Sequence, residues 1–257
     1  MRTGVGTGTG TGTTARGGTT TETAATAHDW PALVTRATEV CVATLARAAA
    51  ETGGTAAAGV SATVDDPSVD HPAIDHPAAV HSAVVDPAWG RPADGERSCR
   101  QLLDHLALGL VGYTGLLIAR PTDRYITLFA SLDPAAPIDA CLDGLGIAGT
   151  VLASTVRDTP PEVRAWHPWG HSDHTGFAAM GVVELLLHTY DITRALGQAW
   201  SPPDELAAPA LARLFPDAPT GTGAAPADVL SWCTGRGDLP GRPRVPAGEW
   251  QWQGSLR

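Results

Sequence analysis

Three titratable residues, Glu184, His188 and Asp191, interrupt the apolar segment GVVELLLHTYDITRALG at positions 181–197. On a helix that turns about 100° per residue, His188 lies roughly 40° from Glu184, and Asp191 lies roughly 20° from it on the other side. All three side chains therefore share one narrow sector, while apolar residues cover most of the remaining surface. Because an ordinary amphipathic helix has a wide polar face, this pattern indicates a polar stripe on a largely buried helix.

The spacing of Glu184 and His188 is suited to metal binding. Residues four apart on a helix present a carboxylate oxygen and an imidazole nitrogen to the same point, and a buried carboxylate is costly unless it is paired or bound to metal. A third ligand is expected from a facing helix, where His105 in LLDHLALGL is the only histidine in the core of another predicted helix. His105, Glu184 and His188 form a His₂Glu set that suits Zn²⁺ and leaves one coordination position open, as catalytic sites do.

Asp191 lies one turn further along the stripe, and we predict that it accepts a hydrogen bond from a ligand histidine. Asp104 points roughly 100° away from His105 and is assigned to the surface or to a helix cap. Glu/His pairs four apart are also common on solvated helix faces. A bundle without metal, in which the buried pair only makes packing specific, therefore stays open as an alternative.

The elements that must position these residues are helices. Of the 257 residues, 43% are hydrophobic but only 5% are aromatic, which favours close-packed helices over a β-sandwich. Four helical segments are expected at about 30–51, 98–119, 133–157 and 181–197, without βαβ alternation. The sequence thus predicts a mainly α protein built on a four-helix bundle.

The remaining segments divide the chain further. Residues 1–27 are a Thr/Gly-rich stretch with little to bury, so a disordered tail is expected. The bundle is assigned to 28–200, with a flexible insertion at 52–95 that is rich in Gly, Pro, Asp and His. The small C-terminal region, 201–257, is expected to hold helix and short strands.

Charge and cysteine content exclude several classes of protein. The formal net charge is −10, with 17 Lys and Arg against 27 Asp and Glu, so neither nucleic acid nor an anionic membrane is an expected partner. We find no apolar run of about 18 residues and no signal-peptide core, and therefore expect a cytoplasmic protein. The cysteines form no CxxC pair and are expected to be buried free thiols: Cys41, Cys99, Cys141 and Cys233.

Two groups of histidines are weaker candidates. Those of the insertion could form a metal tract, although the prolines around them and the lack of an apolar scaffold argue against it. Those of the loop before the fourth helix, with Trp166 and Trp169, could line a substrate entrance, or could be plain polar groups in water. The two groups are His71, His76 and His81, and His167, His171 and His174.

Three arginines near the C-terminal end are candidates for binding an anionic substrate carboxylate, with an ordinary surface position as the alternative. They are Arg236, Arg242 and Arg244. Arg236, in the TGR stretch, is the one that we assign to the catalytic site beside Asp191.

The order of these motifs resembles a known family. D-H-L on the second helix, followed by E-L-L-L-H-T-Y-D-I on the fourth, resembles the DinB-like metal-binding fold. Within that fold, the chain is most similar to the N-terminal domain of mycothiol-dependent maleylpyruvate isomerases. The resemblance covers roughly residues 28–200 without the insertion. W-x-x-G-R-x-x-L-P-G-R-P-R, from Trp232 to Arg244, resembles C-terminal regions attached to this domain in actinobacterial proteins.

The resemblance implies a metal centre and a thiol cosubstrate. It assigns His105, Glu184 and His188 to a divalent ion, usually zinc, whose open position takes mycothiol or another low-molecular-weight thiol. In the isomerases this thiol adds to an unsaturated small substrate, allows bond rotation and leaves again, while other members resemble thiol S-transferases. The long insertion and the short C-terminal region depart from the isomerase pattern. We therefore expect a metal- and thiol-dependent isomerase or transferase, with a non-catalytic metal- or ligand-binding regulatory bundle as the alternative.

Overall fold

The computed structural model describes residues 28–53, 86–128 and 130–255. Its elements are one 3₁₀ helix, η1, and six α-helices, and this described part contains no strand, only isolated bridges. Their bounds are α1 Trp30–Gly53, η1 Pro87–Gly90, α2 Cys99–Ala119, α3 Ile138–Asp158, α4 His174–Ala195, α5 Asp204–Leu214 and α6 Pro226–Cys233. The mainly α prediction is confirmed, and the strands expected near the C-terminal end are absent from residues 201–255.

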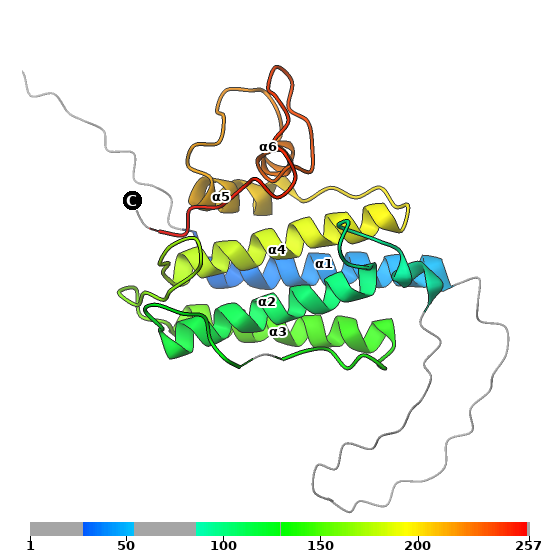
Figure 1. Ribbon diagram of the computed structural model, residues 1–257, viewed down its shortest axis with the longest axis horizontal. Helices are drawn as coiled ribbons and strands as arrows, with labels where there is room; N and C mark the ends of the chain where they lie inside the picture. The colour runs from blue at the N-terminus through cyan, green and yellow to red at the C-terminus, as the bar shows by residue number, and fades with distance from the viewer. Residues whose placement is uncertain (1–27, 54–85, 129, 256–257) are drawn as a thin grey trace, which may run out of the picture.

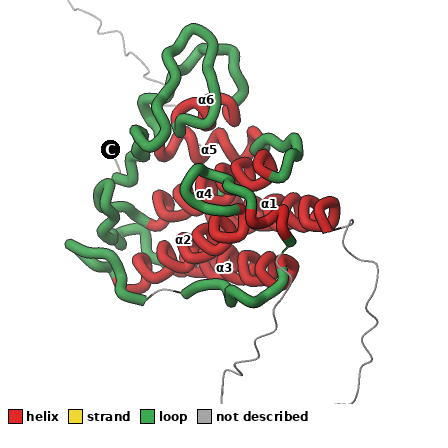
Figure 2. The backbone as a smooth tube through the Cα atoms, turned by 45° about the vertical axis from the view of Figure 1, so that its right-hand side comes forward, coloured by secondary structure: helices red, strands yellow, loops and turns green. Residues whose placement is uncertain are grey.

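The four long helices lie side by side as a bundle, with α5, α6 and the C-terminal loops on the α4 side (Figure 1). Helix α1 packs on α3 and α4, and α2 packs on the same two helices, so α1 and α2 occupy opposite corners. Helix α5 packs on α4, and α6 packs on α5. Figure 2 shows that long loop segments surround the two short helices. Helix α4 is thus covered on several sides, which explains why its sequence is apolar almost all round.

Local capping sets the helix boundaries. Ser98 and Gln101 form a capping box at the start of α2, and Asp173 accepts from the backbone N–H of Gly176 at the start of α4. The fourth helix therefore begins at His174, seven residues before the predicted start. The predicted start of the third helix, at Asp133, is wrong because that side chain accepts from the Ala135 N–H in a turn, and α3 begins only after Pro137.

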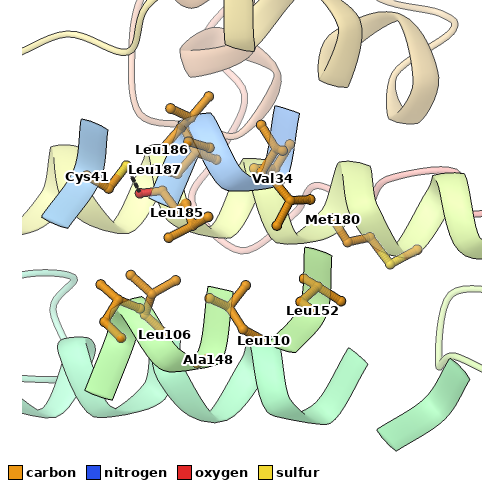
Figure 3. Packing of buried hydrophobic residues seen from close by; sticks show 14 of the residues in the cluster. Val34, Cys41, Leu106, Leu110, Ala148, Leu152, Met180, Leu185, Leu186 and Leu187 are labelled. Carbon is orange, nitrogen blue, oxygen red and sulfur yellow. Dashed lines mark hydrogen bonds between the residues drawn. The ribbon is translucent and has the colours of Figure 1, made fainter. Parts of the chain in front are cut away.

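The core is continuous between the helices, and Figure 3 shows aliphatic side chains from all four of them meeting at its centre. Within this core, a hydrogen bond joins α1 to α4: the Cys41 thiol donates to the Leu185 carbonyl at 3.3 Å. All four cysteines are free thiols; Cys233 is half-buried and the other three are buried.

The ends of the segment predicted as a flexible insertion, 52–95, belong to the folded part of the chain. Residues 54–85, with the candidate histidine tract, lie outside the described residues, as does 1–27. Residues 52 and 53 complete α1, and from 86 onward the chain packs against α2. Trp89 is fully buried there, so one large apolar side chain anchors a stretch that is otherwise rich in Gly, Pro and Asp.

Helices α2 and α3 are each long and apolar enough to meet a simple criterion for a membrane span. That match is weak evidence, because core helices of soluble proteins meet the same criterion. Both helices pack within the bundle here. The expected absence of a spanning helix and the cytoplasmic location remain predictions.

Residues 249–254, which we call the C-terminal strap, cross the N-terminal end of α4. The Gly254 carbonyl accepts from the Ser172 hydroxyl at 2.6 Å and from Arg213 at 2.9 Å. Arg213 also pairs with Asp173, the α4 cap, at 2.9 Å. The strap is therefore tied to the bundle through both main-chain and charged contacts.

Gly149→Ala should destabilise the bundle, because a Cβ at this position would overlap the side chain of Thr38 on α1. We expect a loss of about 1–2 kcal/mol, since overpacking outweighs the gain in helix propensity. Gly146→Ala on the same helix meets open space and should add about 0.5–1 kcal/mol. Urea unfolding of the two variants tests this, and equal effects would contradict the close contact between α1 and α3.

Candidate metal centre

The structure brings His105, Glu184 and His188 together. Each offers one ligand atom, and these three atoms lie within 4.8 Å of one another. It is the one group of this kind found among the described residues. The His105 and His188 rings meet edge to face with centroids 5.4 Å apart. The predicted juxtaposition across α2 and α4 is therefore present, while metal binding itself remains a hypothesis.

Packing of apolar neighbours fixes where these side chains point. Leu103 and Leu106, near His105 on α2, are both fully buried in the core, and the contact between the His105 and His188 rings places His105 at the seam between α2 and α4. On α4, Leu185, Leu186 and Leu187 are buried as well. The polar stripe of α4 therefore faces α2 and the C-terminal region.

Glu184 is held as a carboxylate by its neighbours. The Tyr113 hydroxyl donates to Oε1 at 3.1 Å, and His188 Nε2 lies 2.7 Å from Oε2. Burial alone would raise the pKa of Glu184, but the contacts with His188, His105 and Tyr113 lower it to about 2. Both carboxylate oxygens thus have a partner, and the group is ionised at neutral pH.

His188 lies between two carboxylates. Burial lowers its pKa, but Asp191 and Glu184 outweigh that effect and raise it to about 9. Its Nδ1 is 3.7 Å from Asp191 Oδ2, which is beyond hydrogen-bonding distance, and has no hydrogen-bond partner. The predicted hydrogen bond between Asp191 and a ligand histidine is therefore not formed, although the two groups face each other.

Arg236 explains that separation. Its Nε and one terminal nitrogen lie 3.0 and 2.9 Å from Asp191 Oδ2, so the arginine holds the carboxylate oxygen that faces His188. The guanidinium also lies over the Trp250 ring, 5.8 Å from its centroid. Arg236 is thus at the site, whereas Arg242 and Arg244 are exposed to solvent.

A cavity of about 180 Å³ opens beside the three candidate ligands. Apart from them, its walls comprise one arginine, three tryptophans and two aliphatic residues of α4: Arg236, Trp169, Trp250, Trp252, Val183 and Leu187. Sequence reasoning missed Trp250, Trp252 and Tyr113. The W-Q-W spacing was a usable signal, because residues two apart in an extended segment share one face.

The loop histidines do not line this cavity. His167 is buried among the rings of Tyr113, Phe177 and two tryptophans, and burial lowers its pKa to about 4. The reading of His167 as a polar group in water is therefore wrong. His171 is exposed and bonds the Thr122 carbonyl at 2.8 Å, and His174 is the first residue of α4.

The donor set fits a divalent ion. Two imidazoles and a carboxylate are ligands that Zn²⁺ accepts, and neighbouring ligands in a tetrahedral site are about 3.4 Å apart. Side chains that lie within 4.8 Å of one another need only small rotations to reach that spacing. Asp191 Oδ2 lies 3.7 Å from Nδ1 of His188, beyond hydrogen-bonding distance but on the side where an acceptor orients a ligand histidine in metal sites.

No protein-family model matches the chain, and no curated protein or solved structure gives a significant match. The resemblance to the DinB-like fold therefore rests on the motifs and on their positions along the chain.

Metal-free protein should lose stability as the pH rises through about 9. The pKa of His188 is raised to about 9 from an ordinary value near 6.5, so the stability that its charge contributes is complete below pH 6.5 and is lost above pH 9. Melting temperatures measured in chelator between pH 6 and 10 should fall across this window. His188→Gln should flatten that part of the profile, and an unchanged profile would contradict the ion pair with Glu184.

Proposed function

We propose that this protein binds a divalent metal ion, preferably zinc, on His105, Glu184 and His188. We further propose that the centre activates a low-molecular-weight thiol for an isomerase or S-transferase reaction on a small organic substrate. The observation that carries the proposal is that three ligand atoms from two helices converge at the wall of a cavity. Such a site has protein ligands on one side and room for a further ligand on the other.

When bound, a divalent ion would act as a Lewis acid and lower the pKa of a thiol beside it. Residues of the chain itself would orient the ligands and line the cavity beside them. Tyr113 fixes one oxygen of Glu184 and leaves the other directed toward His188. Leu187, Val183 and the tryptophans restrict water on the cavity side, which strengthens electrostatic interactions there.

Arg236 is suited to hold an anionic group of the substrate. A guanidinium has five N–H donors, and Asp191 receives only one from Nε and one from a terminal nitrogen. A third donor is directed to the Thr234 carbonyl at 3.4 Å, and the other two lie on a residue that lines the cavity. Asp191 fixes the orientation of this guanidinium, and thereby links His188 to the substrate side of the site.

The thiol is proposed on two grounds. The motif order resembles that of mycothiol-dependent isomerases, and no cysteine is among the residues that line the cavity. Thiol chemistry at this position would therefore use an external thiol, for which mycothiol is the candidate that the resemblance supplies.

A non-catalytic, metal-responsive bundle is the second candidate. It is favoured by the contacts of Glu184, whose two oxygens are already satisfied by Tyr113 and His188. A carboxylate that is satisfied without an ion allows the bundle to gain and lose metal without unfolding, as a regulatory protein would require.

One experiment separates these functions. The chain is purified without an affinity tag and its metal content is measured, and the zinc-loaded protein is then titrated with mycothiol in buffers of different ionisation enthalpy. An enzyme of the proposed type holds one ion per chain, binds the thiol and releases a proton. A regulatory bundle holds the ion without binding the thiol, and a structural pair holds neither.

The loss of metal affinity caused by a substitution should depend on the position of the residue in the metal centre. His105→Ala and His188→Ala should abolish metal binding, and Glu184→Gln should weaken it severely because it removes the one negative ligand. Asp191→Asn should cost least, on the order of 10–100-fold in affinity, because it acts through the orientation of His188. Stoichiometry and dissociation constants of the four variants decide the order. Metal loss in Asp191→Asn with retention in Glu184→Gln would make Asp191 the ligand instead.

A further inference from the structure

The three tryptophans of the cavity carry an inference about what the site binds. We infer that the cavity selects a small ligand whose body is a flat apolar ring, which lies against Trp169, Trp250 and Trp252. The inference rests on the proposed function only for the head group, which would reach the candidate metal ligands.

The tryptophan rings form one continuous aromatic wall. Trp169 and Trp252 meet edge to face with centroids 4.7 Å apart, and Trp250 lies 5.6 Å from each of them. Aromatic rings associate in edge-to-face or offset-stacked geometry at such separations. A flat ring in the cavity can extend this cluster in the same way, whereas the faces of the tryptophan rings offer few hydrogen bonds to a hydrated polar body.

The wall is already in place without a ligand. Trp250 and Trp252 belong to the C-terminal strap, which Arg213 and Ser172 hold through the Gly254 carbonyl. Trp252 is only 5% exposed. A wall that is fixed before binding has little conformational freedom left to lose, so more of the contact energy goes into affinity.

Cavity size limits the ligand. A volume of about 180 Å³ is slightly larger than the engineered cavity of about 150 Å³ that holds benzene. It is smaller than the range of roughly 300–1,000 Å³ that is typical for drug-sized ligands. One six-membered ring with a short head group therefore fits, and any larger portion of a thiol cosubstrate must remain outside the cavity.

An ammonium ligand, the other usual partner of clustered tryptophans, does not suit this wall. The three ring centroids lie only 4.7–5.6 Å apart, so the rings pack against one another instead of surrounding a cation. The Arg236 guanidinium already lies over the Trp250 ring, 5.8 Å from its centroid. Like charges thus disfavour a further cation.

The test uses three thiols that share a head group and differ in body: benzyl mercaptan, cyclohexylmethyl mercaptan and 2-mercaptoethanol. Calorimetry on the full chain, with and without zinc, gives their dissociation constants. Benzyl mercaptan should bind at least about tenfold more tightly than 2-mercaptoethanol, and about 3- to 10-fold more tightly than its saturated analogue. The same order should hold, at lower affinity, in metal-free protein.

Trp250→Leu should remove most of the preference for the benzyl body and leave the zinc content unchanged. Trp200→Leu is the matched control, since Trp200 is half-buried but does not line the cavity, and should keep the preference. Melting curves of both variants confirm that each is folded.

The two proposals fail in different ways. Equal affinities for the three thiols, or a full preference in Trp250→Leu, would overturn the aromatic site even where zinc binds. A benzyl preference in metal-free protein that binds no zinc would support the aromatic site and overturn the metal-dependent function.

Discussion

The carboxylate of Glu184 lies between helices of an apolar bundle with 16% of its side chain exposed, where an unpaired charge would still be costly. Its partners come from two directions: His188 from one turn further along α4, and Tyr113 from α2. His105, also on α2, completes the group. The orientation of α2 and α4 about their axes is therefore constrained by charge and hydrogen bonding as well as by aliphatic packing. A rotation of either helix would separate the carboxylate from Tyr113 and His105 and leave it with His188 alone.

Starting from Glu184, negative and positive side chains alternate toward the C-terminal region. His188 follows, then Asp191, and then Arg236, which belongs to the loop after α6. A second pair, between Asp173 and Arg213 of α5, is formed at the N-terminal end of α4, where a negative side chain also interacts favourably with the helix dipole. Asp173 and Asp191, near the two ends of α4, thus each form an ion pair with an arginine of the C-terminal region. This explains how a small region with little core of its own is held at a defined place, and why the cavity lies between it and the bundle.

Periodicity made the helices and the Glu184/His188 pair predictable, because each of these depends on local spacing within one helix. His105 was accessible by elimination, as the one histidine set in an apolar helix opposite α4. The W-Q-W spacing could have shown that Trp250 and Trp252 share one face, but not that they face this site. Trp250 lies 66 positions beyond Glu184 in the sequence, and only the tertiary fold places it there. Trp89 was hidden by a composition that is typical of a flexible segment. The hydrogen bond assigned to Asp191 was misjudged for a similar reason, since its competitor, Arg236, comes from a distant loop.

The charge balance of the site bears on which ligand it would take. In the metal-free protein two cations, His188 and Arg236, balance the carboxylates of Glu184 and Asp191, so the buried group is neutral. An ion of charge two on these ligands requires a neutral His188, which leaves one net positive charge in a region of low dielectric constant. Such a charge is costly unless it is compensated, and an anion with an apolar body can supply the compensation while filling a cavity lined with tryptophan. A thiolate or carboxylate on a flat ring satisfies both demands, whereas a neutral polar ligand or an ammonium compound satisfies neither.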